Sequence, residues 1–261
     1  MNILLTNDDG INSEGLQKLA EILRIRLKHR VFVIAPDSNR SGVSHAISFI
    51  NGPVVLCAAG EDAWSCSGLP VDCVMAGVLG AFPEKPDLVL SGINQGANLG
   101  TDIIFSGTAA AARQASLLGV PGIALSLDGD GHSPFFWNMA VSWIADHLVE
   151  LLAFRGEDSF VNVNIPNRED GPLGIISSWP GVKNYNGTVS VKNNPDGGCL
   201  CRLEPGKEKA EEESGTDCDV VARNYVSVSV IVNHPAILGD FCSSAPAHVA
   251  VSRRKRIKNS G

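Results

Sequence analysis

The chain begins Met1-Asn2-Ile3-Leu4-Leu5-Thr6-Asn7-Asp8-Asp9-Gly10, and this segment indicates how the rest of the fold is arranged. Its apolar residues 3–5 predict a short buried strand, and the chain turns polar immediately afterwards. Ligands of open α/β sheets bind beyond the carboxyl ends of strands, so Asp8 and Asp9 are expected where binding or chemistry takes place. Adjacent carboxylates raise each other's pKa, and a divalent cation relieves that repulsion. The simpler interpretation is a solvated Asp-Gly turn, and the rest of the chain decides between the two.

Composition indicates an ordinary globular protein. The chain has 261 residues, of which 44% are hydrophobic and 19% charged, enough for a large single core or for one main domain with an appendage. The net charge of −7 argues against a nucleic-acid-binding surface, although a bound cation still allows a nucleotide substrate. The basic cluster at residues 253–258 is expected to be a solvated tail.

The cysteines and the apolar runs indicate a cytoplasmic protein. The 7 cysteines are scattered and odd in number, and none forms a Cys-x-x-Cys pair, so neither a disulfide framework nor a zinc site is expected. No signal peptide is expected, and no run of about 18 apolar residues predicts a membrane span.

Strands and helices are predicted to alternate along the first two thirds of the chain. Apolar runs predict strands at residues 3–5, 31–35, 86–90, 123–127 and 160–165. Helices are predicted after Ser13 and over residues 70–79, 109–115 and 135–154, and an accessory hairpin within 47–58 is expected to turn at Asn51-Gly52-Pro53. This order implies βαβ units, and therefore an α/β fold with a mostly parallel sheet and helices on both faces.

The composition changes near residue 170. Gly, Pro, Asn and charged residues dominate as far as Glu213, and residues 225–230 then alternate as in a half-buried antiparallel strand. We therefore expect a catalytic core over residues 1–169 and, over 170–261, an extension with a hairpin arm and a basic tail that is not an independent domain. Exposed arms often exchange between subunits, which suggests an oligomer.

Oxygen-rich loops follow three of the predicted strands. They carry Asp8/Asp9, Asn39/Ser41 and Asn94/Asn98, and parallel strands place such ends at one edge of a sheet. Carboxylate, hydroxyl and amide oxygens together suit Mg²⁺ or Mn²⁺.

An anion site is predicted beside these loops. The Gly-rich segment 92–100 allows close backbone approach, and Ser106-Gly107-Thr108 begins an Ala-rich helix whose free N–H groups favour phosphate. Arg40 is either a phosphate clamp or a surface charge. A metal next to an anion site indicates phosphoryl chemistry with a metal-activated water.

Several motifs together resemble SurE (survival protein E), a family of metal-dependent 5'/3'-nucleotidases and acid phosphatases. The resemblance covers about residues 1–232, and it is weakest across residues 167–215. The motifs are Asn7-Asp8-Asp9-Gly10, residues 35–42, residues 91–100, Ser106-Gly107-Thr108, residues 68–74, residues 162–166, Thr216-Asp217 and residues 225–228.

The resemblance implies a Rossmann-like three-layer core and a C-terminal arm used in dimer or tetramer assembly. It further implies hydrolysis of nucleoside 5'- and 3'-monophosphates, with Asp8, Asp9, Ser41 and Asn94 as ligands of Mg²⁺ or Mn²⁺. Asn98 and residues 106–108 would lie in the phosphate pocket, and one of the two aspartates would assist proton transfer.

The chain also departs from the family pattern. Phe105 stands where the family often has Tyr, and Ser229-Val230-Ile231 replaces the usual Thr-Pro-Leu. The amino-acid sequence of residues 51–67 and of the C-terminal tail is closer to plant members of the family than to bacterial ones.

Other classes fit less well. A dinucleotide-dependent oxidoreductase would need Gly-x-Gly-x-x-Gly after the first strand, and a haloacid-dehalogenase-type phosphatase would need Asp-x-Asp there. The remaining alternative is a non-catalytic, receiver-like regulatory module that binds metal and phosphate. The length of the chain and the segment 91–100 argue against it.

Overall fold

One large sheet organises the molecule. The structure is a computed structural model that describes residues 1–234, except residues 83, 130–132, 205, 207 and 212. Its nine-stranded sheet has the order β3-β4-β2-β1-β5-β6-β7-β13-β8. The strands β4 to β7 of this order run parallel, namely β4 (Ala63–Cys66), β2 (Arg30–Pro36), β1 (Asn2–Thr6), β5 (Leu88–Gln95), β6 (Gly122–Leu127) and β7 (Ser159–Ile165).

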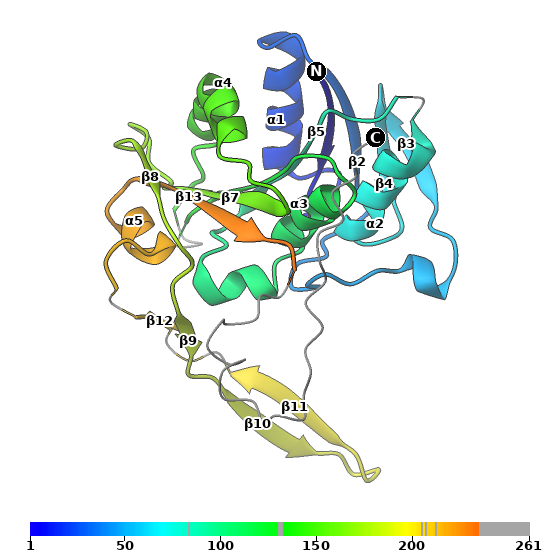
Figure 1. The fold of residues 1–261 in the computed structure, drawn as a ribbon. Coiled ribbons are helices and arrows are strands. Elements are labelled where there is room, and N and C mark those ends of the chain that lie inside the picture. The colour runs from blue at the N-terminus through cyan, green and yellow to red at the C-terminus, as the bar shows by residue number, and fades with distance from the viewer. Residues whose placement is uncertain (83, 130–132, 205, 207, 212, 235–261) are drawn as a thin grey trace, which may run out of the picture.

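Helices cover both faces of this sheet. On one face lie α1 (Glu14–Ile25) and α4 (Trp137–Ala153), and on the other α2 (Pro70–Ala76) and α3 (Gly107–Leu117) (Figure 1). Successive strand side chains point to opposite faces, so Ile3 and Leu5 pack in the core under α1 and α4, whereas Leu4 packs under α2 and α3. The predicted α/β class and its three layers are confirmed.

The hairpin predicted within residues 47–58 is wrong in position, because it lies later in the chain. Residues Phe49–Asn51 form a 3-10 turn, η1, and the hairpin instead joins β3 (Leu56–Gly60) to β4. The chain reverses at Glu61-Asp62, where Asp62 adopts a φ of 49°, a left-handed conformation that Asp tolerates in turns.

Two other elements differ in length from the prediction. The α-helix predicted over 70–79 ends at Ala76, and a wider helical turn, η2 (Gly77–Ala81), follows it. At Gly77 this turn packs closely against the sheet, since a Cβ there would lie 2.6 Å from the Leu4 side chain. Strand β5 continues through Gln95, so the first half of the Gly-rich segment is strand. After it, η3 (Gly100–Ile104) leads into α3.

The sheet continues beyond residue 169. The predicted antiparallel strand is β13 (Val226–Val232), which pairs with β7 and, on its other side, with β8 (Ile175–Ser177). The division of the chain at residue 169 stays a prediction, and it does not coincide with the edge of the sheet.

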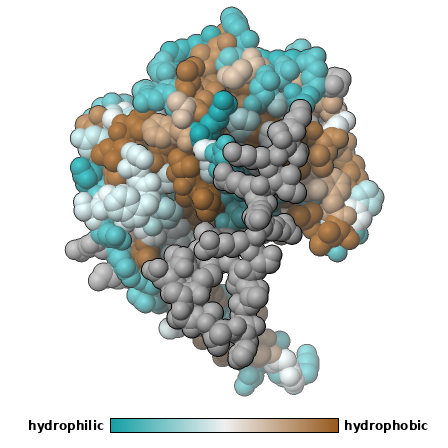
Figure 2. Space-filling view, in the orientation of Figure 1, coloured by the Kyte–Doolittle hydropathy of each residue, from teal (hydrophilic) through white to brown (hydrophobic). Residues whose placement is uncertain are grey.

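The remaining C-terminal elements lie outside the main sheet. They are β9 (Lys183–Tyr185) paired with β12 (Glu208–Ala210), the helix α5 (Asp217–Ala222), and a hairpin of β10 (Thr188–Asn193) and β11 (Cys199–Glu204). The hairpin projects from the body (Figure 1) and exposes Val189, Val191, Leu200 and Leu203. On the face drawn in Figure 2, hydrophobic residues form separate patches among hydrophilic ones. The basic cluster at 253–258 and Cys242 lie outside the described residues, and none of the described helices has the length and apolar character needed to cross a bilayer.

Candidate active site

The ends of β1, β2 and β5 meet at one edge of the sheet. The register pairs Leu5 with Val33 and Thr6 with Ser91, so the loops that follow these strands lie close together. A cavity of about 330 Å³ opens at this edge, with these lining residues: Asp8, Ser41, Gly42, Asn94, Gln95, Gly96, Ala97, Asn98, Asp102, Phe105, Ser106 and Tyr185. It brings together five of the residues predicted for metal or phosphate: Asp8, Ser41, Asn94, Asn98 and Ser106.

Asp8 is held by the first turn of α3. Its Oδ1 accepts a hydrogen bond from the Thr108 hydroxyl at 2.5 Å, and its Oδ2 accepts one from the Thr108 backbone N–H at 3.2 Å. A Cβ on Gly107 would lie 2.9 Å from the same carboxylate, so only glycine allows this close approach. Burial raises the pKa of Asp8, and the hydrogen bonds from Thr108 partly offset that rise.

Asp9 lies nearer the surface and links two other loops. Its Oδ2 accepts a hydrogen bond from the backbone N–H of Gln95 at 3.1 Å, and its Oδ1 accepts one from the Asn39 side chain at 3.4 Å. Asn39 also accepts a hydrogen bond from the Ser41 backbone N–H at 2.9 Å, which brings Ser41 beside the acidic pair. Burial, and then the charge of Asp8, raise the pKa of Asp9 to about 6.

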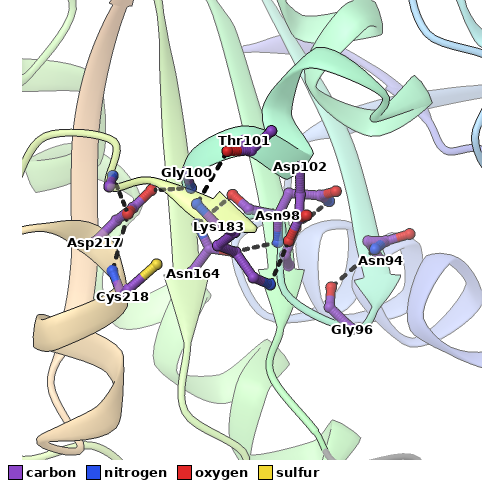
Figure 3. Close-up of polar contacts among 12 residues, drawn as sticks. Asn94, Gly96, Asn98, Gly100, Thr101, Asp102, Asn164, Lys183, Asp217 and Cys218 are labelled. Atoms are coloured by element: carbon purple, nitrogen blue, oxygen red, sulfur yellow. Dashed lines mark hydrogen bonds and ion pairs between the residues drawn. The ribbon is translucent and has the colours of Figure 1, made fainter. Parts of the chain in front are cut away.

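The donor set fits a hard divalent cation. Burial raises the pKa of both Asp8 and Asp9, and the charge of Asp8 raises that of Asp9 further, so a bound cation would stabilise the ionised pair. The Asn94 amide donates from Nδ2 to the Gly96 carbonyl at 2.8 Å, which leaves its oxygen as the acceptor (Figure 3). The described residues include no cluster of three or more His, Cys, Asp or Glu side chains, so the candidate donors at this edge of the sheet are carboxylate, hydroxyl and amide oxygens.

Asn98 and Ser106 are fixed by buried contacts. Asn98 donates from its backbone to Asn164 at 2.7 Å and from its amide to Ser126 at 2.8 Å. Ser106 is the N-cap of α3, and its hydroxyl accepts from the Ala109 N–H at 3.0 Å. Both residues therefore line the cavity, while Gly107 and Thr108 lie behind it, against Asp8, and the phosphate-binding role of all four stays a prediction.

The side chain of Arg40, a predicted phosphate-binding residue, points away from the cavity. Its guanidinium pairs with Asp37 at 3.0 Å and is not among the cavity-lining residues, while its backbone N–H donates to the Asp8 carbonyl at 2.7 Å. The surface-charge interpretation describes this geometry, and a phosphate-binding role for Arg40 stays a prediction.

A second polar cluster, which the sequence does not predict, lies beside the cavity (Figure 3). Lys183 pairs with Asp102 at 2.6 Å, and the carboxylate of Asp217 accepts hydrogen bonds from the backbone N–H groups of Gly100, Gly181 and Cys218 at 2.7–2.9 Å. Thr216-Asp217 belongs to the family motifs, but no local pattern links it to Gly100, 117 residues earlier.

The fold and the site define a class: α/β proteins of the Rossmann-like type with a carboxylate pair at the carboxyl edge of a parallel sheet. Within that class, the chain belongs to the SurE family, because the family described as survival protein SurE matches residues 3–184.

Relatives and a solved structure agree with this assignment. The 5'-nucleotidase SurE of Pelobacter propionicus is 38% identical over 236 residues, which is 88% of this chain and 92% of the relative. That of Geobacter sulfurreducens is 38% identical over 233 residues, 88% of this chain and 87% of the relative. The crystal structure of the SurE protein from Aquifex aeolicus superposes with a TM-score of 0.78 at 35% identity, covering 94% of this chain and 98% of that one. These relatives are bacterial, and the expected closeness to plant members is not borne out.

Proposed function

We propose that this chain is a divalent-metal-dependent phosphomonoesterase that hydrolyses nucleoside 5'-monophosphates and also 3'-monophosphates. The proposal rests on the position of Asp8, which lines the cavity and accepts hydrogen bonds from Thr108 at the N-terminus of α3, in a chain of the SurE family. Asp9 follows it in the chain, outside the cavity lining, and joins the loops of Asn39 and Gln95. Relatives named 5'-nucleotidase that cover most of the chain support the same activity. They favour it over the receiver-like regulatory module.

Asp8, Asp9, Ser41 and Asn94 are the proposed metal ligands, and the metal is Mg²⁺ or Mn²⁺. A divalent cation bound there would neutralise charge on the phosphoryl group and lower the pKa of a bound water molecule. The hydrogen bonds from Thr108 fix the orientation of Asp8. Because Asp9 is the more exposed of the two carboxylates, it is the better placed to accept a proton from water.

The phosphate is proposed to bind at the opening of α3. Asn98 and Ser106 line the cavity, and the N-terminus of α3, where residues 106–108 lie, adds the favourable end of the helix dipole, while the N–H of Thr108 is already donated to Asp8. Arg40 would reach the phosphate only by releasing Asp37, from which it lies 3.0 Å away.

One assay tests this activity. Inorganic phosphate release is measured from 5'-AMP and 3'-AMP with Mg²⁺, with Mn²⁺ and with EDTA. We expect turnover that EDTA abolishes and that re-added metal restores. Absence of turnover with either nucleotide and either metal would contradict the proposal and leave the receiver-like module.

We further propose a cytoplasmic homodimer or homotetramer without nucleic-acid or membrane partners. The six described cysteines are all free thiols, which suits a reducing compartment. The net charge of −7 opposes binding to nucleic acid or to anionic lipid. The β10–β11 hairpin exposes Val189, Val191, Leu200 and Leu203, an apolar surface that a second copy would cover. Light scattering should give a mass of two or four chains.

A further inference from the structure

Two aromatic side chains line the outer part of the cavity. Phe105 follows η3, and Tyr185 belongs to β9 in the C-terminal part of the chain. Both line the same cavity as Asp8 and Asn98, yet Phe105 is 53% exposed and Tyr185 51% exposed, whereas Asp8 and Asn98 are buried. The cavity therefore has an inner part lined by oxygen atoms and an aromatic rim formed by Phe105 and Tyr185.

The structure holds Tyr185 at this rim through its neighbour Lys183. The Lys183 backbone N–H donates to the Thr101 hydroxyl at 3.0 Å, and its Nζ lies 2.6 Å from an oxygen of Asp102. These two charged side chains are only 10% and 17% exposed, so the pair is shielded from water and Figure 3 shows the two pointing toward each other. Strand β9 is thus fixed on the η3 turn, two residues before Tyr185.

Phe105 is held by the same turn. Its backbone N–H donates to the Asp102 carbonyl at 2.9 Å, and its carbonyl accepts from the Ser44 N–H at 3.0 Å. Asp102 therefore anchors both sides of the rim, and its charge is balanced by Lys183. The Lys183 Nζ also lies 5.9 Å from the centre of the Tyr185 ring, so the same lysine contacts both Asp102 and the rim.

We propose that the aromatic rim of Phe105 and Tyr185 binds the nucleobase of the substrate by stacking, while the phosphate occupies the inner part of the cavity. This inference rests on the proposed nucleotidase activity, and it adds which residues recognise the nucleoside. Every base has an aromatic face, so stacking favours nucleotides over other phosphomonoesters without selecting one base. Partly exposed aromatic rings beside a polar pocket are suited to this role, because they offer a large contact area and lose little conformational freedom on binding.

The test compares two substrates that share the phosphate but differ in the base: 5'-AMP and ribose 5-phosphate. With Mn²⁺ present, Tyr185→Ala should raise KM for 5'-AMP about 10-fold and change KM for ribose 5-phosphate less than twofold, with kcat similar for both. Phe105→Ala, in a different part of the fold, should likewise raise KM for 5'-AMP and leave KM for ribose 5-phosphate nearly unchanged. Tyr185→Phe and Phe105→Tyr keep the ring and should restore the low KM. The second tyrosine, Tyr225, does not line the cavity, so Tyr225→Ala is the matched control.

The outcomes separate this inference from the proposed function. If the wild-type protein hydrolyses neither substrate, the proposed function fails. If it hydrolyses both, and the alanine variants shift KM equally for both or for neither, the base-binding rim is wrong. A variant that changes the mass in light scattering and leaves both KM values unchanged would assign Phe105 and Tyr185 to subunit contact and overturn the inference.

Discussion

The Thr108 hydroxyl lies 2.5 Å from Oδ1 of Asp8, joining two residues 100 positions apart in the chain. One follows β1 and the other lies in the first turn of α3, so this contact ties the acidic pair to the helix end at which phosphate is proposed to bind. A single hydroxyl thus couples the orientation of the carboxylate to the position of the helix.

Thr108→Val tests that coupling, because valine keeps the shape of threonine and lacks the hydroxyl. Loss of a hydrogen bond to a buried carboxyl should lower the free energy of unfolding by about 1.5–3 kcal/mol. It should also reduce kcat for 5'-AMP by about 10-fold or more, since Asp8 is no longer held. Urea unfolding and steady-state kinetics measure both. Thr108→Ser keeps the hydroxyl and should behave like the wild type, and equal losses in the two variants would refute a role for the hydroxyl.

Asp8→Asn should abolish turnover while the melting temperature stays similar or rises. The substitution removes a proposed metal ligand, and it also removes a carboxylate whose burial and nearness to Asp9 are unfavourable when no metal is bound. Calorimetry in EDTA and phosphate release with Mn²⁺ measure the two effects. Wild-type activity in this variant would remove Asp8 from the ligand set.

The metal-free protein should lose stability as the pH rises through the range in which Asp9 ionises. The pKa of Asp9 is raised from 3.8 to about 6, so the folded state holds its proton more tightly than the unfolded chain does. Stability therefore falls between about pH 3.8 and pH 6, and the loss is complete above that range.

Asp9→Asn removes this effect. In EDTA, the stability of this variant relative to wild type should be about 1–2 kcal/mol greater at pH 8 than at pH 4, because only the wild type loses stability as Asp9 ionises. One pKa unit corresponds to about 1.4 kcal/mol, and the figure is reduced because water screens the partly exposed Asp9. Urea titrations at the two pH values measure it. The same difference at both pH values would contradict the raised pKa.

Asp217→Ala should destabilise the protein by about 3 kcal/mol or more. The buried carboxylate accepts hydrogen bonds from Gly100, Gly181 and Cys218, and its loss leaves those N–H groups without their partner. Because Gly100 begins the η3 turn, KM for 5'-AMP should rise as well. Asp196→Ala, at the exposed turn of the β10–β11 hairpin, is the control and should change neither quantity. A small effect of Asp217→Ala would show that α5 does not fix the turn.

The central strands and the position of the site could be predicted from the sequence. Strands β1 and β2 are buried on both faces, so each appears as an apolar run with a polar end, and parallel pairing brings those ends together. The same rule predicts that Asp8, Ser41 and Asn94 lie close together, and all three line one cavity.

The rest depends on long-range contacts that leave no local pattern. Lys183 meets Asp102 across 81 residues, in a segment rich in Gly, Pro and charge, so neither the strand β9 nor the position of Tyr185 could be predicted. Arg40 is ambiguous in the sequence for a related reason, since its pairing with Asp37 depends on the conformation of the loop after β2. The turn at Asp62 escapes prediction because Asn51-Gly52-Pro53 carries the stronger turn signal.

Oxygen atoms from three separate segments of the chain are proposed to hold one divalent cation. Crystals grown with Mn²⁺ test it most directly, through anomalous density at the cavity. One peak is expected within coordination distance of Asp8, Asp9, Ser41 and Asn94, and no peak there in crystals of Asp8→Asn. Crystals of the active wild-type protein without a peak at these four residues would contradict it.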